Sequence, residues 1–318
     1  MVGLVGFFGF GKKKQQQPQT PVIRMALMAL GYSTDIAPDG NGGEVNVVTL
    51  GDLTVYFWND PSLYHAQIEW PLTFGQEDTM HAVVGAHMLN VNSSTGVFRV
   101  DTSKGHTAVV CRTWLRAEDG ATFDQYLRFV QAALQDVLPE ASALYDDMFG
   151  TNFEVPEPPE QHPLFAEIPA HLDTPKFETP EVTADRIAAL YSGTVSENTA
   201  HMTVKGREFV AEVHTAETPT GSARVLEISS FKDLPASGPN DIAALINATA
   251  QFNDSMDLIC AVLDEEGQKV ASENLGQPAA RMVIRARCDA TVGLSDSQLK
   301  GYVDEAMHTI AGLLKAIN

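Results

Sequence analysis

The chain has 318 residues, which suits two domains of ordinary size better than a single core. Its 44% hydrophobic and 19% charged residues are typical of a globular protein. The 41 acidic residues outnumber the 21 basic ones, so the net charge is -20. Because such a surface repels phosphate backbones and anionic lipid, we expect no nucleic-acid partner.

The first residues are apolar up to Gly11, and Lys12, Lys13 and Lys14 follow them. A signal peptide has its basic residues before the apolar run, and this run is about half the length that spans a bilayer. We therefore expect a flexible tail over residues 1–19 and no membrane span, with a weak membrane or partner tether as the alternative. The glycine-rich start resembles a phosphate-binding loop but lacks the Ser or Thr after the lysine, so we expect no cofactor.

Three cysteines, Cys111, Cys260 and Cys288, form no C-x-x-C pair, and their number is odd. This pattern disfavours a disulfide framework or a cysteine-based zinc site and favours reduced thiols in a cytoplasmic protein. His81 and His87 are six residues apart, whereas a metal shared on one helix face needs a spacing of three or four. We expect no metal site.

A boundary lies at residues 151–181, where prolines and acidic residues alternate. Proline removes backbone donors and like charges extend the chain, so we expect a linker there. Its apolar residues Leu164, Phe165 and Ile168 could still dock on a domain surface.

The same order of elements is predicted on both sides of this linker. In residues 20–150, helical spacing and strand-forming runs predict a helix at 21–30, strands at 44–50, 53–59 and 63–70, a helix at 78–91, strands at 96–102 and 106–116, and a final helix from 122. In residues 182–318 they predict a helix after Thr183, strands at 199–205, 208–215 and 222–230, a helix from 240, strands at 256–264 and 280–288, and a final helix from 295. Capping boxes, Thr122-x-x-Gln125 and Ser295-x-x-Gln298, open the two final helices. The fold class is therefore α+β, with two tandem α-βββ-α-ββ-α modules.

The last strand of each half aligns without a gap when Gly120 is set against Gly293. Side chains alternate in direction along a strand, so each strand has a core face and an outer face. The predicted core face carries Val109, Cys111, Thr113 and Leu115 in one half and Met282, Ile284, Ala286 and Cys288 in the other. The outer face carries Val110, Arg112 and Trp114, matched by Val283, Arg285 and Arg287.

Each half resembles a YbjN-like domain, a family of candidate bacterial sensory-transduction regulators similar in fold to the type III secretion chaperones. The resemblance rests on the end of the central helix, Asn90 to Asn92 or Asn247 to Asn253, with the two strands and the capped helix that follow it. It implies a mainly antiparallel sheet with helices largely on one face, and a binding or regulatory role. Because the similar chaperones act as dimers, two fused modules could form an intramolecular pseudo-dimer.

No pattern of a nucleophile, a paired base or a metal-ligand set is evident, so we expect a non-enzymatic cytoplasmic protein that binds a protein partner. The outer-face residues Val110, Arg112, Trp114, Val283, Arg285 and Arg287 are the candidate partner-binding surface, because aromatic and arginine side chains are enriched in binding hot spots. The sequence leaves open an enzyme with a site between the modules and a structural, self-assembling protein. It does not identify the partner.

Overall fold

The computed structural model describes residues 20–38, 43–60, 63–117, 120–162, 174–264, 270–272 and 277–317. The predicted tail at 1–19 and the apolar linker residues Leu164, Phe165 and Ile168 lie outside the described residues.

The first module contains one antiparallel sheet with the strand order β1-β2-β3-β4-β6-β5. Its elements are α1 (Thr20–Ala29), β1 (Asp35–Pro38), β2 (Glu44–Leu50), β3 (Leu53–Asn59), β4 (Leu63–Glu69), the 3-10 turn η1 (Gln76–Asp78), α2 (Thr79–Asn92), β5 (Val97–Asp101), β6 (Ala108–Arg116), α3 (Phe123–Gln131), the π-helical turn η2 (Ala132–Val137) and α4 (Leu138–Phe149).

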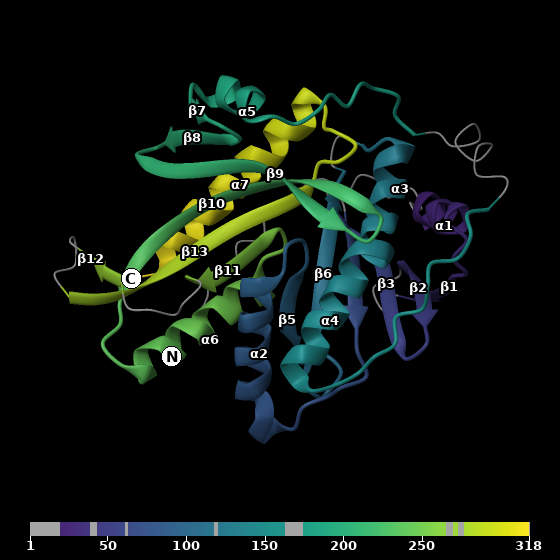
Figure 1. Ribbon diagram of the computed structural model, residues 1–318, viewed down its shortest axis with the longest axis horizontal. Helices are drawn as coiled ribbons and strands as arrows, with labels where there is room; N and C mark the ends of the chain where they lie inside the picture. Colours follow the sequence, from purple (N-terminus) through teal and green to yellow (C-terminus); the bar gives the residue numbers. More distant parts are fainter. Residues whose placement is uncertain are drawn as a thin grey trace.

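The second module repeats this order, with β7-β8-β9-β10-β13-β11 in its sheet and β12 paired to β13. Its elements are α5 (Ala184–Tyr191), β7 (Thr194–Ser196), β8 (Thr199–Val204), β9 (Arg207–Thr218), β10 (Gly221–Pro235), α6 (Pro239–Ser255), β11 (Ile259–Leu263), β12 (Val270–Ser272), β13 (Gln277–Asp289) and α7 (Asp296–Ala316). The equal order confirms the predicted α+β class. Figure 1 shows the two sheets, with α2 beside β5, α6 beside β11, and the two helices side by side.

The structure differs from the predicted α-βββ-α-ββ-α pattern in its edges. Each module has a further short strand before the predicted three, β1 and β7. β1 ends in Pro38, and every residue of β7 is exposed, so neither carries the alternating apolar pattern that marks a half-buried strand. The strands β9 and β10 are also longer than predicted, reaching Thr218 and Pro235.

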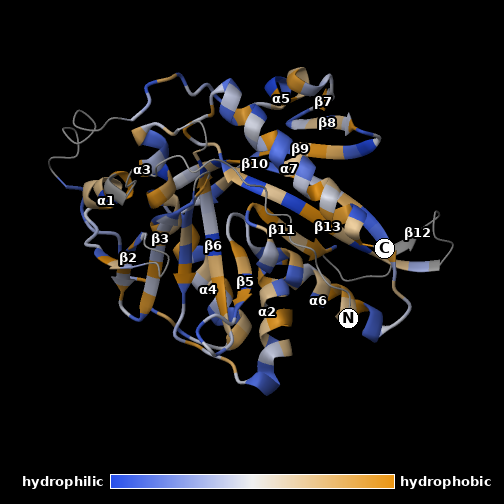
Figure 2. Cartoon of the chain, turned by 180° about the vertical axis from the view of Figure 1, so that it is seen from behind, coloured by the Kyte–Doolittle hydropathy of each residue, from blue (hydrophilic) through white to orange (hydrophobic). Residues whose placement is uncertain are grey.

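Each module has its own apolar core on the face that its helices cover. The core of the first runs from Ile23 to Tyr145 and that of the second from Val182 to Leu314. The predicted core faces are confirmed, because Cys111 and Ile284 are fully buried in the two cores. Leu115 and Cys288, at the ends of these faces, are partly buried and pack against the same cores. Hydropathy alternates along β9 and β10 in Figure 2, as expected for strands with one covered face.

Segments of the linker pack against the modules. Phe153 and Val155 contact the first core, and the backbone N–H of His162 donates to the carbonyl of Ala29 at the end of α1. Further along, the carbonyl oxygens of Thr179 and Pro180 lie so close to Gly293 that a Cβ there would meet them at 2.1 and 2.6 Å. With φ at +82°, this position suits glycine alone on both grounds.

The interface helices α2 and α6 pack against each other across the two modules. One buried asparagine in each of them joins the helix to the next strand. Asn90 of α2 accepts a hydrogen bond from the backbone of Phe98 and donates one to its carbonyl. Asn253 of α6 makes the same pair of bonds with Ala261. The equal spacing of eight residues shows that these two asparagines are structural equivalents.

We expect Asn253→Ala to lower the free energy of unfolding by about 3 kcal/mol, because it leaves the buried N–H and C=O of Ala261 without partners. Urea denaturation measures this change. Asn247→Ala is the matched control: Asn247 is exposed on the same helix, and its change should stay within about 0.5 kcal/mol. Equal losses in both variants would contradict the assigned role of Asn253.

Candidate functional site: the contact between the two modules

The outer faces of the two sheets meet around an apolar centre. Leu63, Val97 and Trp114 of the first module pack with Leu258, Cys260 and Val262 of the second, which form a cluster separate from both module cores. Trp114 is only 7% exposed. The surface predicted to bind a partner therefore contacts the other half of the same chain.

The arginines of β13 reach across to the C-terminal end of α2. Arg285 donates to the carbonyl of Asn90 and Arg287 to the carbonyl of Ser93, which caps the helix. The last carbonyls of a helix lack intrahelical partners and carry the negative end of the helix dipole, so a guanidinium is favourable there. Arg287 also pairs with Glu227 of its own sheet.

A reciprocal contact runs from the first module to the second. Arg99 of β5 donates to the carbonyl of Met256, the C-cap of α6, and pairs with Asp257 at 3.2 Å. Burial and the neighbouring Arg112 lower the pKa of Arg99 to about 10, so Arg99 remains charged at neutral pH. Each module thus holds the end of the other module's interface helix with a cation.

Arg112 contacts both modules. Its guanidinium donates to the side chain of Gln67, lies over the ring of Trp58 with its carbon 5.5 Å from the ring centroid, and is 3.8 Å from Asp257. The remaining predicted residues, Val110 and Val283, lie on the same strands; Val110 is buried and Val283 packs against the apolar centre. The structure thus places all six predicted residues on β6 and β13. Four of them, Arg112, Trp114, Arg285 and Arg287, contact the opposite module.

Two glutamines mark an approximate two-fold relation between the modules. Gln125 and Gln298, both in capping boxes, hydrogen-bond each other in both directions at 3.1 and 3.0 Å. Gln125 also donates to the carbonyl of Gly293, and Gln298 donates to that of Gly120. Reciprocal contacts of this kind define an isologous interface, as in a symmetric dimer.

Two ion pairs follow the same two-fold relation, but the acid and the base change places between the modules. Arg128 of α3 pairs with Asp289 at the end of β13, whereas Glu305 of α7 pairs with Arg116 at the end of β6. Arg128 also contacts the buried carboxylate of Asp136, which accepts hydrogen bonds from the backbone and hydroxyl of Thr220 in the β9–β10 hairpin. The longer hairpin of the second module therefore reaches over the first.

The helices α2 and α6 meet at a buried histidine. The hydroxyl of Thr249 donates to the carbonyl of Ile246, so its oxygen accepts from Nδ1–H of His87, 3.3 Å away. Burial lowers the pKa of His87 to about 4, which keeps the ring neutral at physiological pH. The sequence analysis considered His87 only as a metal ligand and rejected that role on its spacing from His81. Nothing in the sequence pattern indicated its contact with Thr249.

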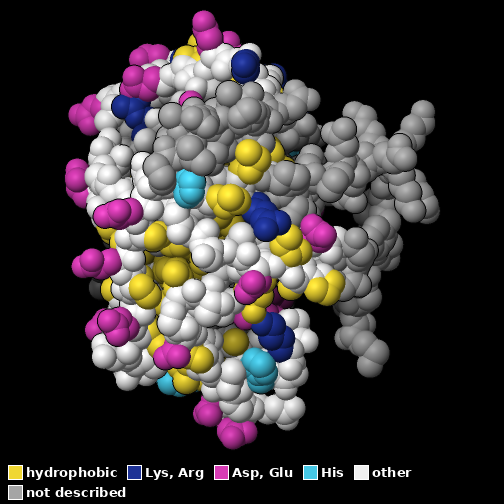
Figure 3. Space-filling model, turned by 90° about the vertical axis from the view of Figure 1, so that its right-hand side faces the viewer, with side chains coloured by type: hydrophobic (Ala, Val, Ile, Leu, Met, Phe, Trp, Pro, Cys, Tyr) yellow, Lys and Arg dark blue, Asp and Glu magenta, His cyan; other side chains and the backbone are white. Residues whose placement is uncertain are grey.

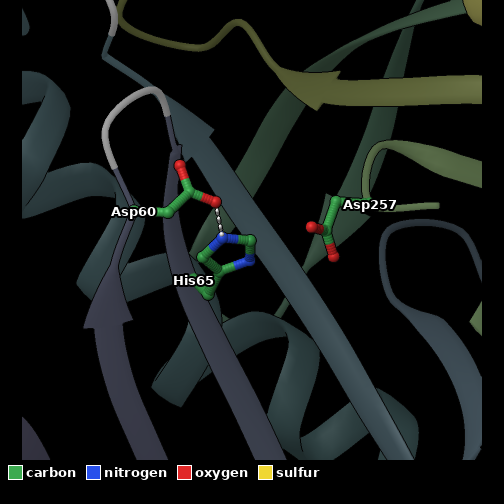
Figure 4. Close-up of side chains that lie close together, drawn as sticks. All are labelled: Asp60, His65 and Asp257. Atoms are coloured by element: carbon green, nitrogen blue, oxygen red, sulfur yellow. Dashed lines mark hydrogen bonds and ion pairs between the residues drawn. The ribbon is translucent and has the colours of Figure 1, made fainter. Parts of the chain in front are cut away.

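Asp60, His65 and Asp257 form a cluster of three groups able to bind a metal, with their ligand atoms within 4.8 Å of one another. Figure 4 shows His65 pointing at Asp60, with Asp257 opposite on the second module. The Nε2 atom of His65 is 2.9 Å from Asp60, and Asp257 pairs with Arg99 and Arg112. Two guanidinium groups beside Asp257 repel a divalent cation, so the arrangement suits an ion-pair network better than a metal centre.

Two cavities between the modules are small. One, lined by Trp114, Gln125 and Tyr302 among others, holds about 50 Å³, and a second beside Asp136 holds about 30 Å³. Small-molecule sites usually hold 300–1,000 Å³. Neither of these two cavities has room for a metabolite.

Comparison with known proteins does not show a family. No family model matches the sequence, and no curated protein matches it. One similar solved structure is the crystal structure of YbjN from E. coli, described as a candidate transcription regulator. It is 15% identical, covers 41% of this chain and 83% of its own, and has a TM-score of 0.29, a level of similarity that carries no argument about function. Among the described residues, no helix has the length and apolar character needed to cross a membrane.

We expect His87 to make the protein less stable in acid. The unfolded chain binds a proton at His87 below about pH 6.5, whereas the folded protein binds it only near pH 4, so stability falls as the pH drops between these values. The loss should approach 3 kcal/mol, at about 1.4 kcal/mol per pKa unit. Denaturation at pH 7 and pH 4.5 should show that the free energy of unfolding falls less in His87→Gln than in the parent. In His81→Gln, a change at an exposed position, it should fall as much as in the parent. The same loss in His87→Gln as in the parent would contradict the assignment.

Proposed function

We propose that this chain is a non-enzymatic protein-binding or regulatory protein whose modules act as a single-chain pseudo-dimer. The resemblance to dimeric secretion chaperones implies the same arrangement, with one chain in place of two. Because its cysteines are unpaired, we place it in the cytoplasm.

The observation that carries this proposal is the reciprocity of the contact between the modules. Gln125 and Gln298 exchange equal bonds, and an arginine of each sheet holds the end of the other module's helix. An interface built this way fixes the modules as one rigid body. A fixed body of two sheets presents composite surfaces that neither module has alone.

An enzyme with a site between the modules is the alternative. The small size of the two cavities between the modules argues against it, and so does the pairing of the acid at the interface edge, where Glu305 binds Arg116. Burial alone would raise the pKa of Asp304, but bonds from Lys300 and Tyr191 outweigh it and lower that pKa. A carboxyl held ionised in this way is a poor general acid at neutral pH.

Surface charge favours a protein partner over a nucleic acid. The chain has 41 acidic and 21 basic residues. On the face shown in Figure 3, hydrophobic side chains lie among the acidic ones. Nucleic-acid affinity needs clustered Lys and Arg, whereas protein interfaces combine apolar contacts with a few charges.

Affinity capture from the source cell followed by reconstitution tests the proposal. We expect one defined protein that forms a stoichiometric complex with the purified chain, measured by light scattering after size exclusion. A chain that binds no protein, but consumes a substrate in a metabolite screen, would establish the enzyme alternative.

The pairing itself is tested by Trp114→Asp, which places a carboxylate against Leu258, Cys260 and Val262. We expect the modules to separate, with a larger radius of gyration by X-ray scattering and a loss of at least about 3 kcal/mol in unfolding free energy. Phe231→Asp, at a half-exposed aromatic position of the second module, is the control and should change neither. Circular dichroism shows whether each module stays folded, and an unchanged radius in folded Trp114→Asp would contradict the pairing.

A further inference from the structure

A wide groove lies between α7 and the β8–β9 hairpin of the second module. It holds about 1040 Å³, with Val204, Phe209, Met307 and Ala311 as its apolar lining. A Cβ added at Gly312, another lining residue, would meet nothing within 4 Å. The groove is thus open and has room for main chain and side chains.

The equivalent region of the first module is covered. The turn Gly51-Asp52 corresponds to the turn Lys205-Gly206, because each turn follows the second strand of its sheet and is closed by a matching strand pair. Helix α1 packs on α3 and β2 there, and Tyr32 accepts a hydrogen bond from Gln135. In the second module α5 packs mainly on β8, which leaves the side of α7 uncovered.

Part of the cover in the first module is the extended, acidic, proline-rich segment at residues 151–162. Its backbone at Phe153 donates to Asp146 of α4, and the carbonyl of Glu154 lies beside the turn at Gly51. Thr151, Phe153 and Val155 are half-buried, whereas Asn152, Glu154 and Pro156 are exposed. The segment therefore binds as a strand-like ribbon with apolar side chains inward at alternate positions.

The groove of the second module has the opposite charge to this segment. Lys205, Arg207 and Lys315 line it, and within the described part of the chain none of the three has an ion-pair partner. The acids of the groove are already paired, Glu305 with Arg116 and Asp304 with Lys300. In a chain of net charge -20, three free cations over an apolar lining favour an acidic ligand.

We infer that this groove binds an extended acidic segment of a partner protein, with apolar side chains at alternate positions. The inference rests on the proposed protein-binding function and adds the site and the chemistry of the ligand. Residues 151–155, at the edge of the corresponding region of the first module, are the template for the bound conformation.

A labelled peptide of residues 151–162, Thr-Asn-Phe-Glu-Val-Pro-Glu-Pro-Pro-Glu-Gln-His, is the probe, and fluorescence anisotropy with the full chain is the measurement. We expect saturable binding that weakens at least tenfold in Lys205→Glu/Lys315→Glu. Gly312→Trp should weaken it as much by filling the groove, without loss of thermal stability, since glycine is a poor helix former. A peptide with Phe153→Ala and Val155→Ala should bind at least tenfold more weakly.

The matched control is Arg24→Glu/Lys176→Glu, which makes the same change of charge at exposed positions outside the groove and should alter binding less than twofold. The inference would be overturned if the peptide showed no saturable binding, or if its affinity were the same for the parent and the groove variants. Self-association of the chain that the groove variants abolish would assign the groove to a second copy and would also overturn it. A partner captured equally by parent and groove variants leaves the proposed function standing and removes only this site.

Discussion

The structure depends on one constraint: each sheet is covered by its own helices on one face, and its other face needs a cover. Around Trp114 that face is apolar, and burying a large side chain of this kind contributes about 2–3 kcal/mol. The second module supplies the cover with β11 and the neighbouring part of β13. Because the outer face of each sheet lacks a cover of its own, one contact between the two faces covers both modules.

The polar part of the contact gives this apolar face its orientation. Hydrophobic surfaces can slide, whereas Arg99, Arg285 and Arg287 bind carbonyls at defined helix ends. Removing the partners of the buried Arg99 would leave a charge in a dry environment, which costs several kcal/mol. The arrangement therefore penalises any shift of one module against the other. The second module departs from the symmetry on one side of α7, where the groove is open.

The repeated fold could be predicted from the sequence because its signals are local. Capping boxes at Thr122 and Ser295, glycines after the last strands and period-two alternation mark the modules without reference to contacts between them. Short edge strands such as β7 were missed because three exposed residues carry no periodic signal. The π-helical turn at Ala132–Val137 was missed for a similar reason: only packing and Pro139 distinguish it from a regular helix.

The site could be predicted only in part. Arg112, Trp114 and Arg285 were identified by alternation, but what covers them depends on how two modules dock, which no strand pattern encodes. One signal was present: Ile259–Leu263 is apolar at every position, and a strand of that kind is buried on both faces. Gln125 and Gln298 also occupy equal positions in the two halves, yet their mutual bonds follow from the docking alone.

The claim that the two halves form one reciprocal body is tested most directly by cutting the chain between them. A protease site inserted within residues 163–173 would separate the halves covalently after purification, and size exclusion with light scattering would measure the mass of the products. The account predicts that the cleaved halves stay together at micromolar concentration with the mass of the intact chain. Two separate species of half that mass would contradict it.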